Sequence, residues 1–417
     1  MASLRETIAD PVTTLDLVSL SWLIPWLFIR MVFGFLKRCL PISTLYPLHW
    51  RQKLGISFLR AFRFGLNQRQ KYAFSHRALT GDQVRAHCAA KKLPHREVRV
   101  PIPSGVTDGA VDGGAVPSPV LHFVTLRTDG EGPTLFYCHG GGYLDPMLGA
   151  GHFVMVHRLA AACKARRIVF LEYTLMPYIT YPGQLVQVTE AARVLLHNEG
   201  IAPADLIVAG DSAGGHLLVS LFAHFTRPCP GVPVLKLPEG SGKQLCAAAV
   251  LICPWLTMTG AGAVAKTNSA HDFLSPDRIA LFAELFRTNP KHVWAEPVDA
   301  PDAKEVWDAA FPPRGRSSRS AAPPPPVGRV LVTAGAAEVI LENCQIFATE
   351  HLKADTVVLA AGGKDKIKKA DMDVLREKPS VFALGPCEVH VQPAIDAALG
   401  YKDGSTAVAI EEFLKSL

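Results

Sequence analysis

The spacing of hydrophobic positions along the chain predicts an α/β protein. From about residue 134 onward, apolar runs with the length of a buried strand alternate with longer stretches of helical spacing. Such alternation is typical of a mostly parallel sheet with helices on both faces. The expected strands are Thr134–Cys138, Ile168–Tyr173, Leu206–Ala209, Ala248–Cys253 and Val330–Thr333, and the expected helices are His152–Ala162, Leu185–His197 and Ala213–Phe225.

Three segments are expected along the chain. Residues 1–49 form an apolar N-terminal segment, and residues 50–94, rich in basic and aromatic residues, are expected to form cap helices. The main α/β domain occupies residues 95–417, and its first strands are expected at Arg96–Pro103 and Pro119–Leu126, where apolar and polar residues alternate. Residues 312–326 (PPRGRSSRSAAPPPP) suit neither strand nor helix, so we treat them as an inserted loop of the main domain.

Composition and charge exclude several classes of protein. The 417 residues are 49% hydrophobic and 19% charged, which excludes a disordered chain. The net charge is +6, but ten Lys and Arg lie between Arg30 and Gly81, so the rest of the chain carries 6 − 10 = −4. Because the basic residues gather beside the apolar segment and no nucleic-acid-binding motif is present, nucleic acid is not an expected partner. The nine cysteines and fifteen histidines show no metal-ligand spacing.

The stretch from Leu17 to Leu36 is apolar apart from one arginine and is long enough to cross a bilayer. Its two tryptophans suit a membrane interface, whereas Pro25 and Arg30 count against a straight span. We expect a membrane anchor or interfacial helix. The alternatives are an apolar helix that caps the folded body and a cleaved signal peptide, which the acidic residues ahead of the stretch disfavour.

Two glycine-rich motifs carry the candidate chemistry. Residues 210–214 (GDSAG) lie between an expected strand and an expected helix, where a sharp turn would present the hydroxyl of Ser212 at the helix N-terminus. Residues 139–142 (HGGG) follow another expected strand, and their backbone N–H groups could stabilise the negative oxygen of a tetrahedral intermediate. Together the motifs predict a serine nucleophile beside an oxyanion hole.

With these two motifs, the sequence from about residue 95 onward resembles the hormone-sensitive lipase branch of the α/β-hydrolases. Within this branch it is most similar to the fungal membrane-anchored steryl acetyl hydrolases and the arylacetamide deacetylases, which share an apolar N-terminal anchor. The resemblance implies an α/β-hydrolase fold and a catalytic triad in the chain order serine, acid, histidine.

The resemblance also implies where the acid and the histidine lie. Glu338 follows an expected strand at the position of the family's acid, although the family normally has aspartate there. Glu342 is the competing candidate, and Asp371 and Asp373 are more distant ones. His390 precedes a final helix, as the family's catalytic histidine does.

The implied reaction is acyl transfer without a metal or organic cofactor. His390 would take the proton of Ser212 as it attacks an ester carbonyl, Glu338 would stabilise the imidazolium, and water would release the acyl group. The expected oxyanion donors are the N–H groups of Gly140, Gly141 and Ala213, and the residues expected to support the motifs are His139, Gly142 and Asp211.

The expected substrate is a small lipophilic ester, such as the acetyl ester of a sterol or of another natural product. Two alternatives stay open: an amide or formamide hydrolase, because HGGG serves both reactions, and a silent ligand receptor like the plant gibberellin receptors, which lack the catalytic histidine. The resemblance implies a body in the lumen of the endoplasmic reticulum, whereas the basic flank favours a cytosolic one. A charged insertion, Lys364 to Lys378, departs from the family and could shape the pocket mouth or mark a loss of catalysis.

Overall fold

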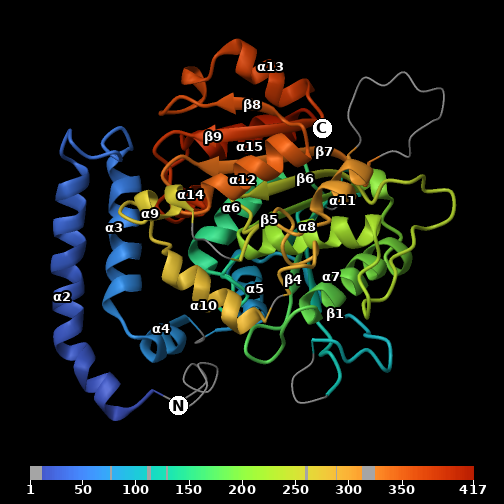
Figure 1. Cartoon of the computed structure of the whole chain (residues 1–417), viewed down its shortest axis with the longest axis horizontal. Coiled ribbons are helices and arrows are strands. Elements are labelled where there is room, and N and C mark those ends of the chain that lie inside the picture. Colours follow the sequence, from blue (N-terminus) through green and yellow to red (C-terminus); the bar gives the residue numbers. More distant parts are fainter. Residues whose placement is uncertain are drawn as a thin grey trace.

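The computed structural model describes residues 12–75, 78–109, 114–127, 130–258, 262–287, 289–311 and 325–417. Within these residues a nine-stranded sheet has the order β1-β2-β4-β3-β5-β6-β7-β9-β8 (Figure 1). β2 is antiparallel to both of its neighbours, and the other pairs are parallel. The strands are β1 (His95–Arg99), β2 (Val120–Thr125), β3 (Thr134–Cys138), β4 (Arg167–Glu172), β5 (Leu206–Asp211), β6 (Cys246–Ile252), β7 (Val327–Gly335), β8 (Asp355–Val358) and β9 (Ser380–Gly385).

Helices cover both faces of this sheet, so the predicted α/β class is confirmed. One face is covered by α5 (Thr80–Lys91), α6 (Gly149–Ala162), α13 (Lys369–Glu377), α14 (Gln392–Ala398) and α15 (Ser405–Lys415). The opposite face is covered by α7 (Gly183–Arg193), α8 (Ala213–Thr226), α10 (Pro276–Phe286), α11 (Ala303–Ala310) and α12 (Leu341–Ile346). Shorter elements are α9 (Ala263–Asn268) and the single turns Val194–Asn198, Pro203–Asp205, Phe347–His351 and Lys364–Lys366.

The central strands are buried on both sides, which explains their continuous apolar runs. In β3, Leu135 and Tyr137 face the core cluster beneath α5, α6 and α15, whereas Phe136 and Cys138 face the cluster beneath α7 and α8. All five residues of β3 and all six of β5 are buried. The sheet is therefore a rigid frame from whose strand ends the functional loops project.

Three N-terminal helices lie at one side of this body. α3 (Trp50–Gly65) packs against α14, and α2 (Thr14–Arg38) lies along the outer side of α3 (Figure 1). The short helix α4 (Gln68–Ser75) lies near the N-terminal end of α2. Polar contacts hold α2 along its length: Asp16 accepts a hydrogen bond from Asn67, and Arg30 donates to the carbonyl of Phe64. By length and composition alone α2 could cross a membrane, and its most apolar part has no buried residue.

Of the two insertions expected in the main domain, residues 312–326 and Lys364 to Lys378, only the second is described in full by the structure. Of residues 312–326, those from 312 to 324 lie outside the described residues. The charged stretch from Lys364 to Lys378 forms a single turn and helix α13, which packs against α15 and β8 through Met372 and Leu375. None of its residues lines the cavity at Ser212, so the insertion does not shape the pocket mouth.

Candidate active site

Ser212 occupies a strained turn between β5 and α8. Its φ is 49° and its ψ is −117°, a positive-φ conformation that is unusual for a residue with a side chain. The turn also requires glycine beside the serine. A Cβ on Gly214 would lie 2.0 Å from the carbonyl oxygen of Cys138, and one on Gly210 would lie 2.6 Å from the carbonyl oxygen of Gly214. The GDSAG pattern therefore follows from how tightly α8 begins against the end of β3.

The structure brings Ser212, His390 and Glu338 into one hydrogen-bonded row. Oγ of Ser212 lies 2.9 Å from Nε2 of His390, and Nδ1 of His390 lies 2.8 Å from Oε2 of Glu338. The three residues follow β5, β9 and β7 at one edge of the sheet. Glu338 is also held by the N–H of Gly335, which donates to Oε1 at 3.0 Å.

The competing acids do not join this row. Glu342 lies exposed in the first turn of α12, and Asp371 and Asp373 belong to α13. Glu338, by contrast, is fully buried against the imidazole. Of the four candidates, the geometry therefore favours Glu338.

Asp272, which the sequence did not single out, ties together the two loops that carry the acid and the histidine. It is fully buried, Oδ1 accepts from the N–H of His390 at 3.3 Å, and Oδ2 accepts from the N–H of Val339 at 2.9 Å. Burial raises the pKa of Asp272 to about 6. Burial alone would lower the pKa of His390, but the hydrogen bond and charge of Glu338, together with the charge of Asp272, raise it above its ordinary value.

The loop of residues 139–142, called the oxyanion loop below, differs from expectation at one residue, Gly140. The N–H of Gly140 donates to Oδ1 of Asp211 at 2.9 Å, so it is not available to an oxyanion. The next two glycines have φ of 113° (Gly141) and 62° (Gly142). Within the described residues, the N–H groups of Gly141, Gly142 and Ala213 donate no hydrogen bond to another group of the protein. The donor set that the geometry offers is therefore Gly141, Gly142 and Ala213.

Asp211 fastens the oxyanion loop to the serine turn. Besides Gly140, it binds the hydroxyl of Tyr137 and Nε2 of His152, the latter at 3.3 Å. Burial acts to raise the pKa of Asp211, but the charge and hydrogen bond of His152 and the hydrogen bond of Tyr137 outweigh burial and lower it. Neither Tyr137 nor His152 belongs to a recognisable motif, and only the folded chain brings them to this carboxylate.

His139 supports the loop from its other side. Its Nε2 lies 3.0 Å from the hydroxyl of Thr80, and Tyr173 donates to its carbonyl oxygen at 2.8 Å. Burial lowers the pKa of His139 to about 4, so its imidazole is neutral at pH 7. This environment suits a bracing residue, as the sequence led us to expect.

A cavity of about 460 Å³ opens above Ser212 and His390. Its walls are mainly apolar and come from α3, the oxyanion loop, α10 and α14. The apolar lining includes Phe58, Leu59, Phe62, Leu148, Phe273, Phe282 and Ile395. The rim is partly open, since Phe58 and Leu148 are about half exposed.

One end of the cavity is charged. Arg63 and Arg278 lie 3.7 and 3.4 Å from Oδ2 of Asp145, and the half-buried Lys71 also lines this end. Burial, together with the nearby charges of Arg278 and Arg63, lowers the pKa of Lys71 to about 8. Among the described lining residues at this end, positive groups outnumber negative ones.

Comparison with known proteins identifies the same fold. Residues 135–313 match a family described as having the alpha/beta hydrolase fold. An esterase structure from the bacterial hormone-sensitive lipase family superposes with a TM-score of 0.54, at 20% identity over 88% of this chain and 97% of that one. The chain has the α/β-hydrolase fold. The α/β-hydrolase fold that HGGG and GDSAGG led us to expect is thereby confirmed.

Two curated relatives are similar in sequence to part of this chain. An acetyl-hydrolase of Streptomyces hygroscopicus is 28% identical over 233 residues, which are 55% of this chain and 64% of the relative. Neutral cholesterol ester hydrolase 1 of Rattus norvegicus is 27% identical over 263 residues, 60% of this chain and 62% of the relative. The chain thus spans somewhat less than two thirds of the length of the curated relatives it matches.

Proposed function

We propose that this α/β-hydrolase cleaves carboxylic esters through an acyl-enzyme formed on Ser212. The observation that carries the proposal is the 2.9 Å contact between Oγ of Ser212 and Nε2 of His390 at the base of an apolar cavity. One curated relative is named a cholesterol ester hydrolase and the other an acetyl-hydrolase, and both names fit hydrolysis of an acyl group from its carrier.

In the first half of the reaction, His390 accepts the Ser212 proton as Oγ attacks the ester carbonyl carbon. The carbonyl oxygen becomes an oxyanion within reach of the N–H groups of Gly141, Gly142 and Ala213, and each such donor contributes about 3 kcal/mol to transition-state stabilisation. Glu338 holds Nδ1–H of His390, so that Nε2 faces the serine, and stabilises the imidazolium. His390 then protonates the departing alcohol, and water repeats the attack on the acyl-enzyme.

We further propose a short acyl group on a lipophilic alcohol. The cavity volume falls within the ~300–1,000 Å³ of sites for small organic ligands, and its lining favours an apolar alcohol. Phe282 packs directly against Gly142, where a Cβ would come within 2.4 Å of its ring, and this leaves little room beside the oxyanion loop. A sterol or a similar natural product acetylated on a hydroxyl fits both features.

We also propose that α2 rests on a membrane as an interfacial helix. Its inner side is tied to α3 and α4 by Asp16, Arg30 and Arg38, the last through Ser57, which suits a helix lying along the body. The outer side carries an exposed apolar stripe: Leu15, Trp22, Trp26, Ile29, Phe33 and Leu36. The endoplasmic reticulum stays a prediction that rests on the family resemblance.

The test uses the full-length protein in detergent with p-nitrophenyl esters of increasing acyl length. We expect turnover that falls with chain length and that Ser212→Ala lowers about 10⁶-fold. Glu338→Gln should cost about 10⁴-fold, because the imidazole loses its orienting carboxylate. The matched variant Glu342→Gln should keep nearly full activity, since Glu342 is exposed and outside the row.

Three results would contradict the proposal. Full activity in Ser212→Ala would exclude Ser212 as the nucleophile. Preferential cleavage of a formanilide over the matching ester would favour the amide hydrolase. A folded protein that binds a lipophilic ester without turnover would favour the receptor.

A further inference from the structure

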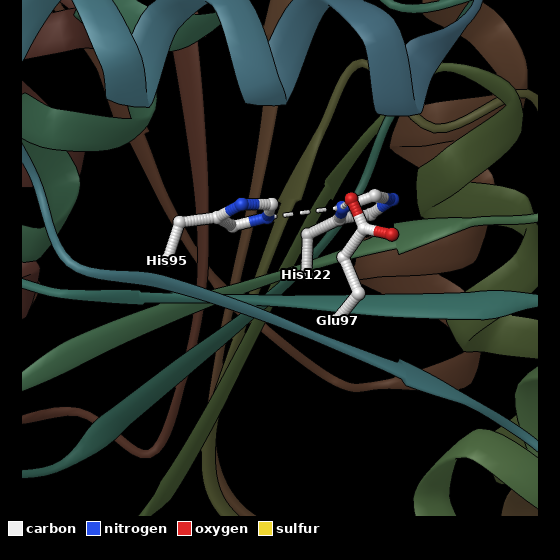
Figure 2. A group of neighbouring side chains, drawn as sticks. All are labelled: His95, Glu97 and His122. Carbon is white, nitrogen blue, oxygen red and sulfur yellow. Dashed lines mark hydrogen bonds and ion pairs between the residues drawn. The ribbon is translucent and has the colours of Figure 1, made fainter.

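A second group of titratable side chains lies on the first two strands, outside the cavity at Ser212. Figure 2 shows His95 and Glu97 of β1 and His122 of β2 pointing to the same side of the sheet. The strand register explains why: Glu97 stands directly opposite His122, and His95 lies two residues before Glu97 on β1, so its side chain points to the same face. Three potential metal ligands therefore share one small surface of the sheet.

Two of the three distances between their donor atoms match those of ligands around a tetrahedral metal ion, and all three lie within 4.8 Å. Nε2 of His95 lies 3.2 Å from Nδ1 of His122, and this Nδ1 lies 3.5 Å from Oε1 of Glu97. With Zn–N and Zn–O bonds of about 2.0–2.2 Å at tetrahedral angles, neighbouring ligand atoms stand about 3.3–3.6 Å apart. The side chains therefore need only small rotations to aim at one ion.

Neighbouring groups hold these ligands in the required state. Nε2 of His122 lies 2.9 Å from Oε2 of Glu172 on β4, a contact that favours the tautomer in which Nε2–H donates to the carboxylate and the lone pair of Nδ1 faces His95. Glu97 is held in turn by Arg85 of α5, which donates to Oε1 at 2.7 Å. A carboxylate behind a histidine and a hydrogen bond to a carboxylate ligand are the usual surroundings of metal ligands.

We propose that His95, Glu97 and His122 bind one divalent transition-metal ion, with zinc as the best match and water as the fourth ligand. Two imidazoles and a carboxylate form a donor set that zinc accepts. His122 is buried, His95 is half-buried and Glu97 is exposed, so the ion enters from the solvent side.

The proposed ion has a structural role. Oε1 of Glu172 accepts from the N–H of Gly81 at 2.9 Å, which connects His122 to the first turn of α5. The neighbouring Thr80 contacts His139 of the oxyanion loop. A metal on β1 and β2 would therefore rigidify the frame that holds this loop, without contributing a group to the reaction.

The experiment is calorimetric titration of the full-length protein with zinc chloride after dialysis against a chelator. We expect one zinc ion per chain, and His95→Gln and Glu97→Gln should each raise the Kd by at least about 100-fold. Glu172→Gln should raise the Kd by about 10- to 100-fold, as loss of such a supporting carboxylate typically does. The visible spectrum of the cobalt-substituted protein should show tetrahedral coordination that His95→Gln abolishes.

Two controls test other places where zinc could bind. Nε2 of His87 lies 3.1 Å from Nε2 of His157, a similar nitrogen spacing, but the described residues place no carboxylate beside that pair. His390 lies with Glu338 and Cys253 in a second possible donor set. His87→Gln and His390→Gln should therefore bind zinc as the parent protein does.

Two kinds of result would overturn the proposal. One is the absence of zinc binding at about 100 μM. The other is binding that survives in both His95→Gln and Glu97→Gln, or that is lost in either control. Because His95 and Glu97 are not buried, unchanged unfolding temperatures in the absence of zinc should show that their variants fold. Ester turnover is measured separately and does not decide this outcome.

Discussion

Replacing Asp272 with asparagine tests how the structure holds the histidine loop and the acid loop together. The carboxylate accepts N–H groups from His390 and Val339 through different oxygens. Asparagine offers one oxygen, and its NH₂ group would face the other N–H. A buried donor without its acceptor costs about 1–3 kcal/mol, so we expect Asp272→Asn to lose about that much unfolding free energy.

The same substitution changes the charge beside His390, the general base of the proposed mechanism. Since Asp272 contributes to the raised pKa of His390, its removal should lower that pKa. In the proposed mechanism neutral His390 is the active form, so activity should rise with pH through the pKa of His390. The acid limb of the pH profile should therefore move to lower pH in Asp272→Asn. The plateau should fall at the same time, because the imidazolium of the transition state loses a stabilising charge.

The assay is the pH dependence of kcat/KM for p-nitrophenyl acetate, which reports the pKa of the base in the free enzyme. Asp371→Asn is the control, because Asp371 lies on α13, which contributes no residue to the cavity. A purely structural role for Asp272 would lower the plateau and leave the acid limb in place. An unchanged acid limb, or one moved to higher pH, would refute the electrostatic reasoning.

Three further predictions follow from the cavity and from α2. Gly142→Ala, at φ 62° and in contact with a phenylalanine ring, should lower kcat/KM about 10²- to 10³-fold while circular dichroism shows a folded protein. The KM of an ester that carries a carboxylate should rise as Lys71 loses its proton near pH 8, and Lys71→Gln should remove this pH dependence while leaving neutral esters unaffected. Trp26→Glu on the exposed stripe should reduce flotation with phospholipid vesicles about tenfold, whereas Val358→Glu, at an exposed apolar position on β8, should not.

The pattern of apolar positions predicted the central sheet because parallel strands buried on both faces have a distinctive composition. β3 was located to the residue, and β5 and β6 to within a few residues. β8 was missed because it has four residues, of which one is buried. β9 is as apolar as β5, so the pattern contained its signal, but the charged stretch ahead of it concealed the alternation of strand and helix.

In the candidate site, too, residues marked by a local sequence motif could be predicted, whereas contacts between distant segments could not. Ser212, Glu338 and His390 could be named because each follows a strand at a position that the family resemblance implies. Whether Gly140 or Gly142 directs its N–H into the cavity depends on where Asp211 lies in space, and sequence cannot supply that. Asp272 has no motif around it and lies 118 residues from the histidine whose backbone it binds.

α3 lies between α2 and the cavity at Ser212. One side of this helix carries α2, and the other supplies Phe58, Leu59 and Phe62 to the cavity wall. It is also built into the body: a Cβ on Gly55 would lie 2.6 Å from Ile395 of α14. A truncation that removed α3 would therefore open the cavity as well as detach α2. Under the proposed function, a lipophilic ester leaving a bilayer beneath α2 would meet the exposed Phe58 at the cavity rim before it reached Ser212.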